Sequence, residues 1–123
     1  MGDLRELDLA LLARAAEVCC QPLRFGVVPV QAPLADELTL RLEARDPLGE
    51  RQPQVDLELE IYRSGSELNV MLSRANDSNT PLLWQGQHAV WVEAVNGQRC
   101  SAPEGGASLE GLARRIRALI SPG

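Results

Sequence analysis

Apolar and polar residues alternate on both sides of a short glycine turn in residues 55–73. A period of two is typical of half-buried β-strands, because successive side chains on a strand point to opposite faces. A two-residue type II′ turn at Gly65-Ser66 would join two such strands with their apolar faces on the same side. The pattern therefore predicts a central β-hairpin. Its expected apolar cross-strand pairs are Ile61 with Val70 and Leu59 with Leu72.

Shorter alternating or apolar runs predict further strands on both sides of this hairpin. Pro29 has no backbone N–H to donate, so the strand that contains it should lie at the edge of the sheet. Asn96-Gly97 is a strong signal for a two-residue hairpin turn and should return a short strand after it. The predicted additional strands are residues 25–30, 38–45, 82–84, 88–95 and 98–102.

The first and last segments of the chain have the apolar spacing of amphipathic helices. Asp3, with Glu6 in a capping box, should begin the first helix over residues 3–20, and Pro22 should stop it. Ser108 is the expected cap of the second. The stripe predicted for the first helix is Leu4, Leu7, Leu11, Ala15 and Val18, widened by Leu12 and Cys19; that for the second is Leu109, Leu112, Ala113, Ile116, Leu119 and Ile120.

These elements fit together in two layers. An antiparallel meander has one apolar side, and both amphipathic helices need an apolar partner, so packing both helices on that side covers every apolar face. We therefore expect an α+β fold: an antiparallel β-meander of five to six strands, with an N-terminal and a C-terminal helix packed on one face. The whole chain, residues 1–123, should form a single domain.

The charge of the chain narrows its partners and its location. Twelve basic residues, all arginine, stand against seventeen acidic ones, which gives a formal net charge of −5. This charge argues against unaided binding to nucleic acid or to an anionic membrane, since both need a cationic surface. No uncharged run has the length of a secretory leader or a membrane span, so we expect a cytoplasmic protein. An odd number of cysteines, Cys19, Cys20 and Cys100, fits that location.

The residues that could carry chemistry form no recognisable catalytic or metal motif. The cysteines and His88 offer four zinc ligands but have no Cys-x-x-Cys spacing, so the cysteines are better explained as small apolar residues. Asp56, Glu58 and Glu60 alternate along one strand, which is the ordinary pattern of a solvated sheet face. We therefore expect no catalytic residues, no metal and no cofactor.

His88 and Cys100 lie on the two strands that the Asn96-Gly97 turn would join. A two-residue turn pairs Cys100 with Glu93, several residues along the ladder from His88. Because a nucleophile and its base must lie within hydrogen-bond reach, this register argues against a Cys–His enzyme.

The aromatic residues point to a protein interface. If Val90 and Val92 face the core, Trp91 faces outward and would anchor an interface. The reverse register would bury Ala89, Trp91 and Val95 instead, and a short apolar run does not choose between the two. Helices that cover a face leave the sheet edges open, and proteins usually pair or cover such edges. The interface residues we expect are Trp91, Tyr62, Met71 and Trp84.

Two functions are compatible with these features. The first is a non-enzymatic protein-interaction module, such as an adaptor, an assembly factor or a small chaperone, whose partner is another protein or itself, most simply as a homodimer. In outline, a small acidic helix–sheet–helix chain is similar to several unrelated groups, among them the small secretion chaperones that dimerise and hold an unfolded segment. The alternative is a small-molecule or anion-binding domain, with or without catalytic activity, that uses a crevice between the sheet and the C-terminal helix. Its polar groups would be Gly105, Gly106, Ser108 and Arg114.

Overall fold

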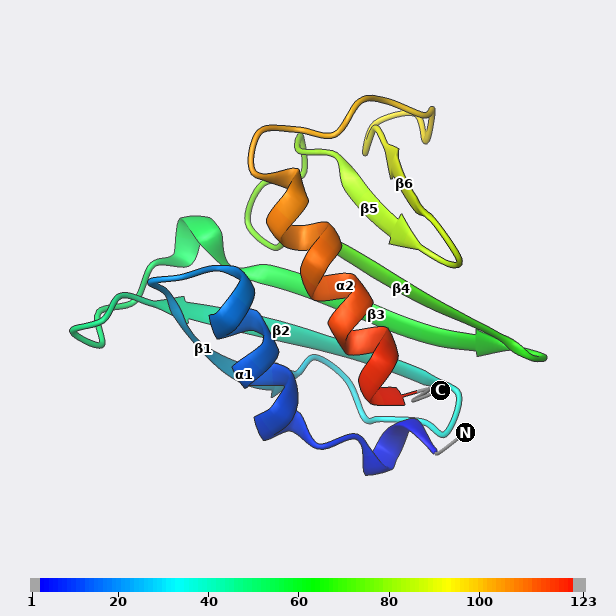
Figure 1. The fold of residues 1–123 in the computed structure, drawn as a ribbon, viewed down its shortest axis with the longest axis horizontal. Coiled ribbons are helices and arrows are strands. Elements are labelled where there is room, and N and C mark those ends of the chain that lie inside the picture. Colours follow the sequence, from blue (N-terminus) through cyan, green and yellow to red (C-terminus); the bar gives the residue numbers. More distant parts are fainter. Residues whose placement is uncertain (1–2, 121–123) are drawn as a thin grey trace.

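A computed structural model of the chain describes residues 3–120, in which two α-helices lie on one side of a single sheet (Figure 1). Within this range six antiparallel strands each pair with the next strand in sequence. This is the α+β meander that the sequence predicts. The strands are β1 (Arg24–Pro29), β2 (Glu37–Arg45), β3 (Leu57–Ser64), β4 (Glu67–Arg74), β5 (Leu82–Gln85) and β6 (Ala89–Val92); the α-helices are α1 (Leu9–Cys19) and α2 (Gly106–Ile120), and two 3₁₀ turns are η1 (Leu4–Glu6) and η2 (Pro53–Val55).

The central hairpin β3–β4 has the register that the sequence predicts. Gly65 has a φ of 63°, whereas Ser66 keeps a negative φ, as a type II′ turn requires. Ile61 pairs with Val70, and the pair Leu59–Leu72 is also present. Pro29 lies in β1, which is an edge strand of the sheet, so that prediction is confirmed as well.

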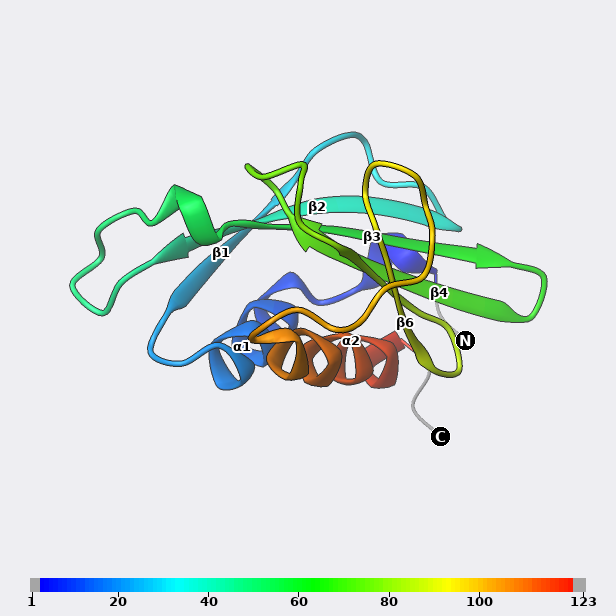
Figure 2. The same ribbon diagram turned by 90° about the horizontal axis from the view of Figure 1, so that it is seen from above.

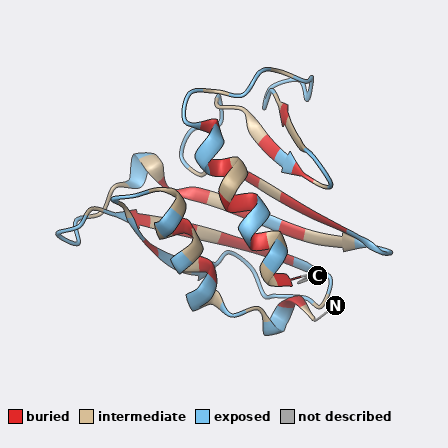
Figure 3. Ribbon diagram, in the orientation of Figure 1, coloured by how far each residue is buried: buried red, intermediate tan, exposed pale blue. Residues whose placement is uncertain are grey.

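The core lies between the sheet and the helices. Seen along the sheet, α1 and α2 occupy the same side of it (Figure 2). Buried apolar positions alternate along β2, β3 and β4, and buried positions recur along α2 (Figure 3). The sheet residues with no exposed surface include Leu40, Leu42, Leu57, Leu59, Val70 and Leu72, and those of α2 are Leu112, Ala113 and Ile116.

The first helix differs from the prediction because it begins later. Asp3 caps only the 3₁₀ turn η1, where its side chain accepts the N–H of Arg5 at 2.8 Å. The chain then becomes extended at Leu7, and Asp8 caps α1 by accepting the N–H groups of Ala10 and Leu11. A single helix over residues 3–20 is therefore wrong, because Asp8 supplies a second and stronger start signal.

The buried stripe of α1 is also rotated from the predicted one. Leu12 and Ala16 have no exposed surface, whereas Leu11 and Val18 are 49% and 46% exposed. α1 is apolar on most of its circumference, so two stripes have helical spacing, and the sequence pattern does not select between them. The predicted stripe includes two residues that lie on the surface.

Asp56 is not on the solvated face of β3 but is almost completely buried, with 1% exposure, at the end of the β2–β3 connection. Its Oδ1 accepts the backbone N–H of Ala44 at 2.7 Å, and its two oxygens accept the guanidinium of Arg51 at 2.9 and 2.8 Å. Arg51 also donates to the carbonyl of Ala44 at 2.6 Å. The connection between β2 and β3 is thus tied to the sheet by a buried carboxylate.

The turn after β6 is wider than a two-residue hairpin. Val92 bridges Arg99, and the N–H of Glu93 donates to the carbonyl of Gln98 at 2.8 Å. Gly97, with a φ of 69°, sits inside this larger loop. The predicted return strand is therefore reduced to an isolated bridge, and Cys100 does not face Glu93.

Candidate functional site

The sheet face turned away from the helices carries an exposed tryptophan, Trp84, in β5. Its side chain is 42% exposed, and its direct neighbours across the strands are Met71 in β4 and Val90 in β6. Leu82 and Val92 form the next pair on the same face. With Tyr62 of β3 these residues form what we call the outer patch: Tyr62, Met71, Leu82, Trp84, Val90 and Val92.

A buried amide holds the ring of Trp84 in place. The indole N–H donates to Oδ1 of Asn69 at 2.9 Å, and Asn69 is only 8% exposed. Asn69 in turn pairs across the strands with Tyr62. Because the ring already has a fixed partner, a protein that binds on it has little side-chain entropy to remove.

Sequence reasoning names Tyr62, Met71 and Trp84 of the outer patch but misses Leu82, Val90 and Val92, and it also misses Asn69. The alternation of β5 could have found Leu82, which lies two residues before Trp84 and therefore on the same face. One of the two registers that the sequence leaves open for this strand places Val90 in the core. Asn69 gives no sequence signal, since its role depends on the register between β4 and β5.

Trp91 is not an exposed interface residue, so the prediction that uses it as an anchor is wrong. It is 6% exposed, pairs with Leu83, and faces the core. Its indole N–H donates to Oε2 of Glu110 at 2.9 Å, and its Cζ2 lies 3.1 Å from where a Cβ on Gly106 would be. The register that buries Trp91 is the correct one, although Val95, which it would also have buried, is 84% exposed.

The outer edge of β6 is also less open than the sequence implies. The carbonyl of Trp91 accepts the N–H of Cys100 at 2.9 Å, and Glu93 and Gln98 add a second bond along the same edge. The segment after the Asn96-Gly97 loop therefore covers part of the edge. The edge of β6 is thus partly paired within the chain, which removes the reason to expect a partner there.

The predicted anion-binding residues do not converge on a crevice between sheet and helix. The N–H of Gly106 donates to the carbonyl of Pro103, and that of Ser108 donates to Gly105, so these groups already have partners. Gly105 has a φ of 79°, and α2 begins directly after it at Gly106, so Ser108 is not the cap of α2. Ser108 and Arg114 do line one shallow depression, but it opens on the outer surface of the helices and does not include either glycine.

The cysteines and His88 are not grouped into a recognisable catalytic or metal-binding site in the described residues. Cys19 faces α2, where its Sγ lies 3.9 Å from where a Cβ on Gly111 would be. Burial, and secondarily the neighbouring Cys19, raises the pKa of the Cys20 thiol. Cys100 follows the bridge beside β6, and His88 is exposed. Within residues 3–120 no three His, Cys, Asp or Glu side chains are grouped so as to hold a metal ion.

Comparison with known proteins yields one family. Over residues 9–119 the chain matches a family described as a domain of unknown function (DUF8659). No curated protein and no solved structure matches the chain. Among the helices of residues 3–120, none has the length and apolar character needed to cross a membrane.

Proposed function

We propose that this chain, which belongs to the DUF8659 family of unknown function, is a non-enzymatic protein-interaction module that binds through the outer patch. The observation that supports the proposal is the exposure of Trp84 on a sheet face that the helices leave uncovered (Figure 2). Tryptophan is among the residues most enriched at the energetic centres of interfaces. Fixed by Asn69 and flanked by Met71 and Val90, Trp84 is suited to be such a centre.

Charged residues border the outer patch on the side of β2 and β3. Glu60 is the neighbour of Met71, and Arg41 pairs with Glu58 one step further from Trp84. An apolar centre with a charged margin is the usual composition of a protein interface. The margin would fix the orientation of the partner, and the ring of Trp84 would supply most of the affinity.

The partner in this proposal is another protein or a second copy of the chain. A homodimer is the first candidate, because a two-fold axis through the outer patch would bury both copies of Trp84 in one contact. The module would act in the cytoplasm, where Cys19, Cys20 and Cys100, which are free thiols in this structure, stay reduced. Whether it serves as an adaptor, an assembly factor or a small chaperone follows from the identity of the partner.

The first experiment tests for self-association by sedimentation over a range of protein concentrations. Trp84→Glu should shift the chain towards the monomer by at least about ten-fold in dissociation constant. Leu48→Glu is the matched control, because Leu48 is 94% exposed and lies on the β2–β3 loop, away from the patch. A dimer that both variants weaken equally would contradict an interface at Trp84.

The second experiment covers a different partner. A photo-crosslinking amino acid replaces Trp84 in the native cell, and the same amino acid at Leu48 serves as the control. We expect a defined protein adduct from position 84 that is missing from position 48. If the chain is a monomer at all concentrations and neither position yields an adduct, the proposal is wrong.

A further inference from the structure

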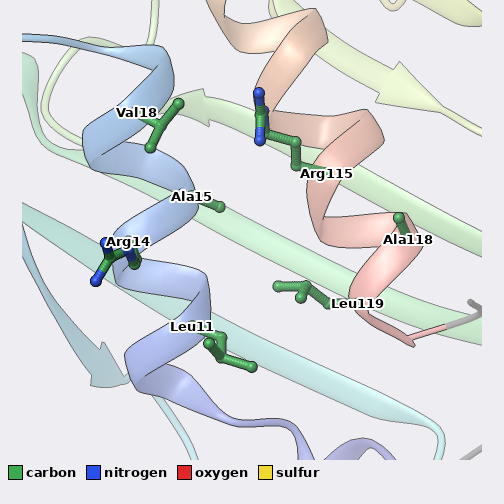
Figure 4. Close-up of a pocket in the computed structure, with 7 residues that line it drawn as sticks. All are labelled: Leu11, Arg14, Ala15, Val18, Arg115, Ala118 and Leu119. Atoms are coloured by element: carbon green, nitrogen blue, oxygen red, sulfur yellow. The ribbon is translucent and has the colours of Figure 1, made fainter.

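An apolar groove runs between the two helices on the side away from the sheet. Leu11, Ala15 and Val18 line it from α1, and Ala118 and Leu119 line it from α2. Figure 4 shows the side chain of Leu119 extending towards α1 opposite Leu11. With Leu11 and Val18 about half exposed, the groove is an apolar surface in contact with water.

Arginines stand along this groove. Arg14 of α1 and Arg115 of α2 are part of its lining (Figure 4). Arg114 is exposed and lines a neighbouring depression together with Val18 and Arg115. In the described part of the chain, no carboxylate forms an ion pair with any of these three guanidinium groups.

The carboxylates of the two helices point away from the groove. Glu17 of α1 accepts the backbone N–H of Phe25 in β1 at 3.1 Å, and Glu110 of α2 accepts the indole N–H of Trp91 in β6. Both acids are thus held against the sheet. The exposed charged residues within α1 and α2 are therefore all arginines, although the chain as a whole has a net charge of −5.

We propose that this groove binds an acidic amphipathic helix of a partner protein, laid along α1 and α2 as a third helix. Leu11, Ala15 and Val18 are spaced i, i+4 and i+7, about two helical turns or 10 Å, which matches the anchor spacing of a helix in a groove. The small side chains of Ala15 and Ala118 let the backbone of the partner approach closely. Glutamates or aspartates beside its apolar stripe would pair with Arg14 and Arg115.

Charge favours an acidic helix over a second copy of the chain as the ligand of this groove. Two helix layers facing each other would bring the arginines of one copy against those of the other, and like charges in apposition oppose association. An anionic membrane would meet the basic groove but also the net negative charge of the whole molecule. A discrete acidic helix satisfies the arginines and the apolar groove together.

This site goes beyond the proposed function, because it lies on the other side of the sheet from the outer patch (Figure 2). A chain with both surfaces would bridge two proteins. The two assignments are independent: Trp84→Glu should leave binding in the groove unchanged, within about two-fold.

A displayed library of designed amphipathic helices tests the groove directly. The library keeps an i, i+4, i+7 apolar stripe and varies the flanking positions among acidic, basic and neutral residues. It is selected on the full chain and counter-selected on the double variant Leu11→Gln, Val18→Gln, whose changes lie on the surface and preserve helix propensity. We expect the enriched helices to carry glutamate or aspartate at the flanks and to bind in the micromolar range or tighter.

Charge reversal at the groove then separates specific binding from general attraction. For an enriched peptide, Arg14→Glu with Arg115→Glu should weaken binding by at least about ten-fold in fluorescence anisotropy. Arg24→Glu with Arg99→Glu is the matched control, since it makes the same change of charge at exposed positions beside the sheet edges. Circular dichroism should show all variants folded.

Three results would overturn the proposal. One is that no helix is enriched over the counter-selection. Another is that the enriched helices are basic, or that charge reversal at the control arginines weakens their binding to the chain as much as charge reversal at the groove arginines does. The third is that anionic vesicles of phosphatidylserine bind the chain through Arg14 and Arg115 while acidic helices do not.

Discussion

The indole N–H of Trp91 in β6 donates to Oε2 of Glu110 in α2 across 2.9 Å, beneath the helix layer. Trp84, which directly follows Leu83, the cross-strand partner of Trp91, has its own N–H bound to Asn69 on the opposite face of the sheet. The two tryptophans of the chain therefore have different tasks. Trp91 ties the end of the sheet to α2, and Trp84 keeps its ring partly exposed on the outer face of the sheet.

Replacing each tryptophan by alanine should separate these tasks. Trp91→Ala should lower the free energy of unfolding by about 3–5 kcal/mol, because it leaves a cavity and removes the hydrogen bond to Glu110. Trp84→Ala should lower it by no more than about 1 kcal/mol, because its side chain is 42% exposed. Urea unfolding followed by circular dichroism measures both. Equal losses would contradict the different placement of the two rings.

Two glycines of α2 form a matched pair for a test of packing. A Cβ at Gly111 would meet only the side chains of Arg114 and Cys19, each at 3.9 Å, so Gly111→Ala should stabilise the chain by about 0.4–1 kcal/mol. A Cβ at Gly106 would lie 3.1 Å from the ring of Trp91 and 3.3 Å from Pro103. Gly106→Ala should therefore be less stable than Gly111→Ala, and thermal unfolding of the two variants side by side decides this. The reverse order would show that Trp91 does not pack against the start of α2.

The ion pair between the buried Asp56 and the partly exposed Arg51 should make the free energy of unfolding depend on pH. The hydrogen bonds from Arg51, and then that from the N–H of Ala44, hold the pKa of Asp56 below its usual value. A carboxyl group whose pKa is lowered by folding stabilises the fold fully when the pH is above its pKa in the unfolded chain, about 3.9. That stabilisation is lost as the pH falls through the pKa of the folded state.

Asp56→Asn should remove this dependence. We expect it to lower the free energy of unfolding by about 1–3 kcal/mol at pH 7, because the charged hydrogen bonds to Arg51 are lost. Below about pH 4 the difference from the parent should shrink. Glu58→Gln, two residues further along the chain and on the outer face of β3, is the control and should change little at either pH. A difference that stays constant from pH 7 to pH 2 would be inconsistent with an ionised Asp56.

The cysteines should be chemically quiet. Since burial raises the pKa of Cys20, less of it is thiolate at pH 7.5 than in an unfolded chain, and iodoacetamide should modify it more slowly in buffer than in urea. Mass spectrometry after timed quenching gives both rates. Reducing agent should not move the melting temperature, and elemental analysis should find no stoichiometric metal. Equal rates in buffer and urea, or one zinc per chain, would contradict this expectation.

The sheet could be predicted where local signals agree. In β3–β4 the alternation of apolar residues and the glycine turn specify the same register, so Ile61 and Val70 had to pair. The two-residue turn predicted at Gly97 was wrong, because a glycine with positive φ fits a wide loop as well as a two-residue turn. Only the bridge of Val92 to Arg99 distinguishes the two.

The predictions that were wrong concern residues whose burial depends on contacts between distant segments of the chain. Asp56 follows the same alternation as the glutamates after it, and its burial requires Arg51 to fold back onto it. Leu11 and Leu12 are equally apolar, so only the sheet decides which one is buried. The sequence was enough to name Trp84 as an aromatic residue of the outer patch. That Trp84 and Trp91 lie on opposite faces of the sheet follows only from the pairing of β5 with β6.

The groove between α1 and α2 is built from helices that have the whole sheet, residues 24–92, between them in the chain. At synthesis rates of about 5–20 residues per second, the residues of α1 are made several seconds before those of α2. During that time Leu11 and Val18 have no α2 opposite them, so the groove does not exist. An acidic helix that requires both walls would thus engage only molecules in which the early and late segments have met, and binding would report that folding is complete.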